Sequence, residues 1–114
     1  MKSDDDSRTA GSTPTPRPHR PDPELDREVL LGVTRRDPDA LGRLFDAWID
    51  RLHGLALRLM GESALAEDVV HDVFLKVHRA AHTLDPERPP GPWLMRITTN
   101  ACRDVWRSRG HRMM

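Results

Sequence analysis

Apolar residues recur at steps of three and four over most of this 114-residue chain, which is the spacing of helices that bury one face. No segment alternates between apolar and polar residues as a half-buried strand does. The pattern predicts four helices, over residues 24–36, 39–60 and 63–81 and from Gly91 onward. Four amphipathic helices with short connections form a compact all-α bundle, and we predict that fold.

Turn and capping residues separate the predicted helices. Asp37 is a good N-cap, and Pro38 suits the first position of the helix that follows it. Gly61 is placed to end that helix, and Ser63 to cap the next one. Three prolines in residues 82–90 make that segment a loop before the last helix.

The apolar face of each helix is assigned to the core. The predicted core residues of the first three helices are Leu25, Val29, Leu30, Val33, Leu41, Leu44, Phe45, Trp48, Leu52, Leu55, Ala56, Leu59, Leu65, Ala66, Val69, Val70, Val73, Phe74, Val77, Ala80 and Ala81. Those of the last helix are Leu94, Met95, Ile97, Ala101, Cys102, Val105 and Trp106. The lone cysteine, Cys102, is therefore interpreted as a small core residue without chemistry of its own.

The first 23 residues differ in composition from the rest. They contain the acidic run Asp4-Asp5-Asp6, many prolines and hardly any apolar side chain. Such a segment buries too little surface to offset the entropy lost on ordering, so we predict a disordered tail before a folded domain over residues 24–112. No stretch resembles a signal peptide or is long and apolar enough to span a bilayer. We therefore expect a cytoplasmic protein with no membrane partner.

The opposite side of the last helix is polar and basic. A helical period places five side chains within an arc of about 80° that contains no acid. They are Trp93, Arg96, Asn100, Arg103 and Arg107. Guanidinium groups neutralise phosphates, an amide reads a base edge and an indole stacks on a base, so this face suits nucleic acid. A solvated basic face is the alternative interpretation.

The polar half of the third helix has a leucine in its middle. Leu75 is surrounded there by charged and imidazole side chains: Glu67, Asp68, His71, Asp72, His78, Arg79 and His82. Asp68 and Asp72 lie four residues apart, and like charges at that spacing weaken an isolated helix. A basic partner helix with an apolar contact would offset that cost, so the face is typical of a protein docking site. A singly exposed leucine without function is the alternative.

Several other kinds of chemistry lack support. The formal net charge is zero, so bulk charge does not indicate a nucleic-acid binder, although acids gather in residues 62–87 and arginines after residue 93. His78 with His82, and Asp68 with His71, have the spacing of metal ligands, but they face outward and lack a matching set on another helix. No phosphate-binding loop, nucleophile elbow or catalytic triad is present. We expect no enzymatic activity, metal or cofactor.

Three segments together resemble region 2 of the extracytoplasmic-function (ECF) group of sigma-70 factors. They are DALGRLF at residues 39–45, AEDVVHDVFLKV at residues 66–77 and PWLMRITTN at residues 92–100. The resemblance covers about residues 25–112. It implies an all-α region 2 domain that binds core RNA polymerase and promoter DNA during transcription initiation.

The resemblance also implies roles for the two surfaces. The third helix would dock on the clamp helices of the polymerase β′ subunit, and its assigned residues are Asp68, His71, Asp72, Leu75 and Arg79. The last helix would contact the −10 element through Trp93, Arg96, Asn100, Arg103 and Arg107. The loop at residues 82–90, with Leu84 and Asp85, corresponds to the specificity loop that receives a base flipped from the single-stranded non-template strand.

Some positions depart from the family pattern. His71 stands where glutamine is usual, and Leu84 stands where an aromatic residue is common. The chain has no segment resembling region 4, so we expect a sigma factor truncated before that region. The alternatives are a region-2-only regulator or decoy, and a helical protein-interaction module that does not read DNA. The promoter sequence and any anti-sigma factor partner stay open.

Overall fold

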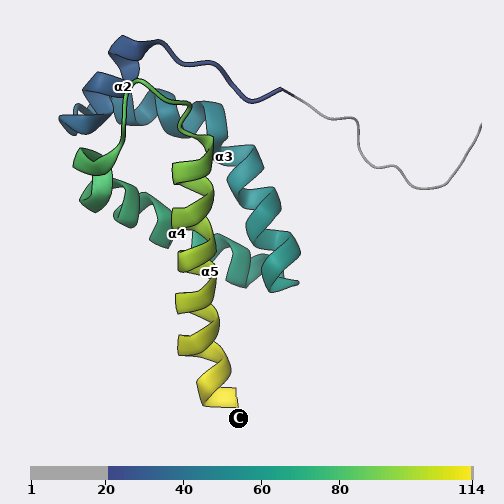
Figure 1. Ribbon diagram of the computed structural model, residues 1–114. Coiled ribbons are helices and arrows are strands. Elements are labelled where there is room, and N and C mark those ends of the chain that lie inside the picture. The colour runs from purple at the N-terminus through teal and green to yellow at the C-terminus, as the bar shows by residue number, and fades with distance from the viewer. Residues whose placement is uncertain (1–20, 114) are drawn as a thin grey trace, which may run out of the picture.

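The computed structural model describes residues 21–113, with side chains up to residue 108. Five helical elements follow one another: α2 (Arg27–Thr34), α3 (Pro38–Met60), α4 (Ser63–Ala80), the short 3-10 helix η1 (Ala81–Thr83) and α5 (Gly91–Met113). These described residues contain no strand, and α3, α4 and α5 pack on one another (Figure 1). The predicted all-α bundle is confirmed. Residues 1–20 of the predicted tail lie outside the described part of the chain.

Local sequence explains most helix boundaries. Pro38 occupies the first turn of α3, and Gly61 ends that helix with φ of 73°, donating its amide to the Leu57 carbonyl at 2.8 Å. The predicted cap at Ser63 is wrong, because Glu62 holds the extended N-cap position and Ser63 is the first helical residue. The first helix is shorter than predicted, since residues 24–26 lie outside it and Arg36 leaves the helical region with φ of 60°.

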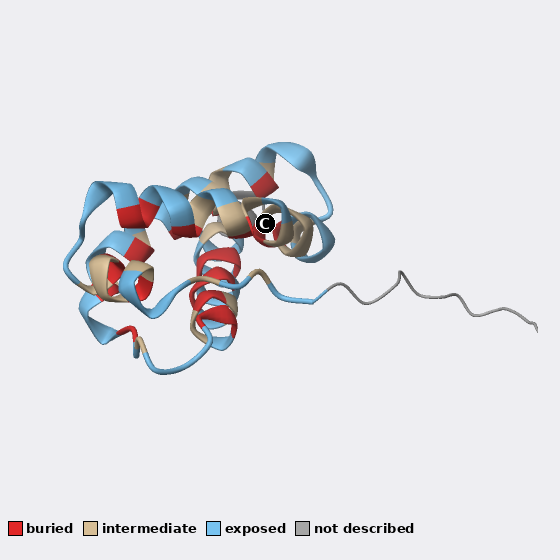
Figure 2. Ribbon diagram, turned by 90° about the horizontal axis from the view of Figure 1, so that it is seen from above, coloured by how far each residue is buried: buried red, intermediate tan, exposed pale blue. Residues whose placement is uncertain are grey.

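The core lies where α3 crosses the other helices. Trp48, Leu44 and Leu52 of α3 are almost completely buried, and they belong to one apolar cluster with residues of all the other elements. Figure 2 shows the buried positions along the inward sides of the helices. Cys102 is buried in the same cluster, as predicted, and burial raises the pKa of its thiol.

Three residues predicted for the core are exposed. Phe74 retains 49% of its accessible surface, Leu59 retains 53% and Trp106 retains 68%. The C-terminal part of α5 extends beyond the other helices, so the end of its apolar side has no facing helix in the described structure (Figure 1). The helical period identified the correct face, but it could not show how far each helix overlaps its neighbours.

An extended segment before α2 packs against the start of α5. The carboxylate of Asp22 accepts a hydrogen bond of 3.0 Å from Arg51 of α3, and the Pro21 carbonyl accepts another from the same guanidinium. Gly91 is buried where Trp48 and Asp22 approach it, and a Cβ there would lie 3.0 Å from the Trp48 ring. Glycine thus allows α5 to begin close to α3. Among the described residues, no helix has the length and apolarity needed to cross a membrane.

Candidate functional site

An open groove separates α4 from α5, and it contains most of the residues predicted for docking. Its lining consists of Asp68, His71, Asp72 and Leu75 from α4 and of Asp104, Val105 and Ser108 from α5. We call this surface the docking groove. Leu75 retains 50% of its accessible surface, so an apolar anchor is present in a rim of carboxylates. The four α4 residues were predicted from one helix, whereas the contribution of α5 was not.

Arg79 lies beyond the docking groove, in the last turn of α4. Its side chain is exposed, while its main-chain carbonyl accepts a hydrogen bond of 3.0 Å from Arg36. Arg36 also donates to the carbonyl of His78 at 2.8 Å. Two carbonyls at the end of α4 therefore accept hydrogen bonds from a charged side chain of the α2–α3 connection. These bonds stabilise the C-terminal end of α4.

Lys76 connects the two helices that form the docking groove. Its ammonium lies 2.8 Å from the carboxylate of Asp104 on α5 and 3.8 Å from that of Asp72 on α4. The hydrogen bond from Lys76 holds the pKa of Asp104 below its ordinary value, and the same bond raises the pKa of Lys76. Sequence analysis missed Lys76, although its position four residues after Asp72 was a usable signal.

A second, more apolar groove lies between α3 and α4. It is lined by Phe45, Ile49, Glu67, Val70, His71 and Phe74. The rings of Phe45 and Phe74 are 5.0 Å apart in a tilted arrangement, so Phe74 packs on α3 although half of its surface is exposed. His71 borders both grooves, which places an imidazole in the middle of the exposed side of α4.

The polar side of α5 is open to solvent as predicted. Arg96, Asn100, Arg103 and Arg107 are all exposed, and we call these four residues the basic face. Trp93 is half-buried at the edge of the core, and its indole N–H donates to the Thr83 hydroxyl at 3.0 Å. Trp93 is therefore held in place by η1 while part of its ring is accessible.

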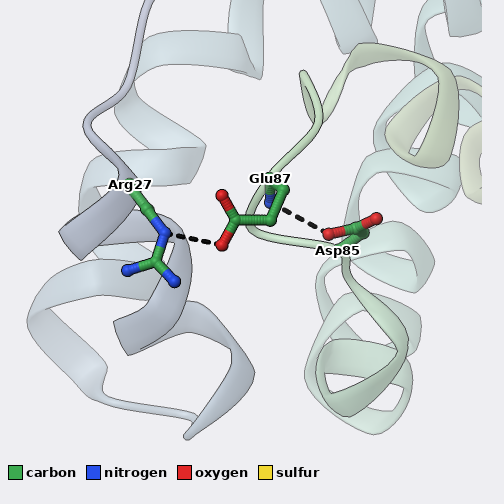
Figure 3. A network of polar contacts seen from close by, with 3 residues as sticks. All are labelled: Arg27, Asp85 and Glu87. Atoms are coloured by element: carbon green, nitrogen blue, oxygen red, sulfur yellow. Dashed lines mark hydrogen bonds and ion pairs between the residues drawn. The ribbon is translucent and has the colours of Figure 1, made fainter.

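Polar residues of the loop before α5 form hydrogen bonds within the loop and to α2. Asp85 accepts a hydrogen bond of 2.9 Å from the amide of Glu87, and the Glu87 carboxylate accepts one of 2.6 Å from Arg27 of α2 (Figure 3). Arg88 lies 3.5 Å from the second oxygen of Asp85. These contacts connect the loop to α2, and no local sequence pattern indicated the Arg27 contact.

Leu84 differs from the prediction for this loop. Only 4% of its surface is accessible, and it belongs to the apolar core. A side chain in that position cannot contact DNA without leaving the core, so the surface available for DNA excludes it. Asp85, by contrast, is exposed, although its carboxylate already bonds within the loop.

No cluster of three or more histidine, cysteine, aspartate or glutamate side chains is placed to hold a metal in the described part of the chain. His78 lies in the last turn of α4 and His82 in η1 directly after it, where the Nδ1 of His82 is 3.3 Å from Arg36. The outward position of these residues agrees with their place on the polar half of the helix.

Comparison with known proteins finds RNA polymerase sigma factors among the relatives of this chain. The chain is 38% identical over 73 residues to the RNA polymerase sigma factor CarQ of Myxococcus xanthus, a match that covers 64% of this chain and 42% of CarQ. It is 33% identical over 85 residues to the ECF RNA polymerase sigma factor SigK of Mycobacterium sp. (strain KMS), covering 73% and 44% of the two chains. It is 30% identical over 83 residues to the ECF RNA polymerase sigma factor SigW of Bacillus subtilis, with the same coverage.

The chain thus spans less than half the length of these relatives. Residues 44–112 match the family model for sigma-70 region 2, and this range includes both sides of the docking groove and the whole basic face. Because the match extends over more than half of the sequence and agrees with the helical fold, the chain belongs to the sigma-70 region 2 family.

Proposed function

We propose that this domain docks on the β′ clamp helices of core RNA polymerase through the docking groove and contacts the promoter −10 element through the basic face of α5. The observation that carries the proposal is that Asp68, His71, Asp72 and Leu75 line one groove. The domain would thereby take part in transcription initiation as a binding component, with no catalytic step of its own.

The chemistry of the docking groove suits a basic helix. Asp68 and Asp72 supply carboxylates on the α4 side, and Leu75 supplies an exposed apolar contact in the same lining. A helix laid in such a groove buries the leucine at its centre and pairs its cations with the rim. Charge complementarity of this kind speeds association and makes it sensitive to salt.

The chemistry of the basic face suits the phosphates and bases of an opened promoter. Arg96, Arg103 and Arg107 present guanidinium groups to solvent, and Asn100 presents an amide among them. Trp93 lies at the start of the same helix, where a partly accessible indole can stack on an unpaired base. The loop next to Trp93 is held by hydrogen bonds, so it loses less conformational entropy when a flipped base binds.

Binding to a fluorescent single-stranded oligodeoxynucleotide with an A/T-rich −10-like sequence tests the DNA part of this proposal. We expect affinity to fall steeply with salt, and the Arg103→Ala/Arg107→Ala variant to lower the slope of log affinity against log salt by about 1 to 2. Arg58→Ala, which removes an exposed cation from α3, is the matched control and should leave the slope unchanged.

Two results would contradict the proposed DNA contact. One is a salt slope for the double variant equal to that of the wild type. The other is an equal loss in the Arg58→Ala control, because that would assign the binding to bulk charge. Either result would favour a protein-interaction module whose arginines are merely solvated.

A further inference from the structure

The basic face has a carboxylate at its edge. Asp104 is the only acidic residue of α5, and it lies one turn from Asn100 on one side and from Arg107 on the other. Residues at these spacings are neighbours on a helix surface, about 5–6 Å apart at their Cβ atoms. An ionised side chain there would repel phosphates and could pair with Arg107, which would remove that arginine from DNA.

In the structure, the carboxylate of Asp104 is paired with a lysine of α4. Lys76 reaches across from α4 and lies 2.8 Å from Asp104, on the side of α5 that faces the docking groove. Lys76 is the more buried partner, with 26% of its side chain accessible against 47% for Asp104. Because the Lys76 side chain is largely covered, the pair loses less side-chain entropy on forming than two freely exposed residues would.

We propose that Lys76 is a positioning residue for DNA binding: it neutralises Asp104, directs that carboxylate toward α4 and leaves Arg107 available for phosphates. This inference rests on the proposed function. Lys76 belongs to α4, which forms one side of the docking groove, but it would affect DNA binding at the basic face of α5. Its contact with Asp104 involves neither the polymerase nor the DNA.

Lys76 also contacts a second carboxylate of the docking groove, that of Asp72 on α4. Its ammonium lies 3.8 Å from Asp72, so one cation serves a carboxylate of α4 and a carboxylate of α5. Without Lys76, Asp72 and Asp104 would both border the groove without this cation, and Asp104 would be left to Arg103 and Arg107 of α5. The field over the basic face would become less favourable for DNA even though no arginine had been changed.

A set of charge variants tests the proposal with the fluorescent oligonucleotide described above. We expect Lys76→Met to weaken binding by about two- to fivefold, the scale of one partly exposed charge pair. Adding Asp104→Asn to Lys76→Met should restore wild-type affinity, because no carboxylate then needs a partner. Lys76→Arg should bind as the wild type does, since it keeps a cation in reach of Asp104.

The control for overall charge is the pair Lys76→Met/Asp46→Asn. It has the same net charge as the restored variant, but it removes an exposed carboxylate of α3 and leaves Asp104 without its cation. We expect this pair to remain as weak as Lys76→Met alone. Circular dichroism of each variant shows whether it keeps the helical fold, and Lys76→Gln replaces Lys76→Met throughout the set if Lys76→Met does not fold.

Equal restoration by Asp46→Asn and Asp104→Asn would overturn the proposal, because only net charge would then matter. Failure of Asp104→Asn to restore a folded Lys76→Met variant would also overturn it, since Lys76 would then act in another way. These results differ from failure of the proposed function itself, in which the wild-type chain would not bind the oligonucleotide at any salt concentration and this inference would fall with it.

Discussion

The guanidinium of Arg36 lies at the C-terminal end of α4, where its Nε donates a hydrogen bond of 2.8 Å to the carbonyl of His78. Its Nη2 donates to the carbonyl of Arg79 at 3.0 Å. Arg36 itself lies two residues after the end of α2 and has φ of 60°, which is costly for a residue with a Cβ. The residue that has the strained backbone after α2 is therefore also the residue that donates hydrogen bonds to the last carbonyls of α4.

Replacing Arg36 separates these two effects. Arg36→Ala keeps the strained backbone and loses both hydrogen bonds, so we expect the free energy of unfolding to fall by about 1–2 kcal/mol. Arg36→Gly loses the same bonds but relieves the positive φ, and it should be less destabilising than Arg36→Ala. Urea unfolding of both variants measures the difference. An alanine variant as stable as the wild type would show that the carbonyls of α4 do not need this donor.

Gly32 marks the closest approach of α2 to α3. A Cβ at this position would lie 2.6 Å from the Cβ of Ala40, and neither atom belongs to a flexible side chain that could move away. We expect Gly32→Ala to lower stability by about 1–3 kcal/mol, in spite of the better helix propensity of alanine.

Gly42 of α3 provides the matched control for this substitution. A Cβ there would have no neighbour within 4 Å, so Gly42→Ala should raise stability by up to about 1 kcal/mol through helix propensity alone. Thermal unfolding of the two variants compares a crowded glycine with an open one. Stabilisation by both substitutions would show that α2 and α3 can separate without cost.

The rate of chemical modification of Cys102 measures how firmly α5 is packed on the core. Its side chain is buried in the core, and burial raises the pKa of the thiol, so both access and the population of thiolate are reduced. We expect iodoacetamide to modify the native protein far more slowly than the urea-unfolded chain at the same pH. Similar rates in the two states would mean that α5 separates from the core readily.

The ion pair between Lys76 and Asp104 predicts a small pH dependence of stability. The folded-state pKa of Asp104 lies below the ordinary value of 3.8, so its contribution is present at neutral pH and lost as the pH falls through the folded pKa. The pKa of Lys76 is raised above 10.5, so the contribution also disappears in strong alkali.

Asp104→Asn measures that contribution. We expect it to lower the free energy of unfolding by less than about 1 kcal/mol between roughly pH 5 and 9, because the pair is partly exposed. The difference from the wild type should vanish in acid. Urea unfolding across this pH range, with Asp46→Asn as the control, provides the comparison, and a difference that persisted in acid would assign it to packing rather than charge.

Much of the fold could be predicted because it depends on local spacing. The helical period identified all four α-helices that the structure describes in residues 21–113, and Gly61 ended α3 where its backbone freedom indicated. The α4 side of the docking groove could be predicted for the same reason, since residues 68, 71, 72 and 75 share one face of any helix that contains them.

The remaining features depend on contacts between distant segments. Arg27 and Glu87 lie 60 residues apart, and no local pattern indicates that they meet. Leu84 turned inward because the chain after η1 closes over the core, a result of packing rather than of loop composition. Lys76 had one visible partner in Asp72, but its shorter contact, to Asp104, requires knowing which side of α5 faces α4.

Titration of the purified chain with the isolated clamp-helix segment of β′ from the same organism measures polymerase docking itself. We expect saturable binding by the wild type and loss of binding in Leu75→Asp, with helicity unchanged because Leu75 is half exposed. Leu59→Asp, at an equally exposed leucine of α3 outside the groove, should bind as the wild type does. Absence of binding by the folded wild type, or equal binding by Leu75→Asp, would contradict the assignment of the α4–α5 groove to polymerase docking.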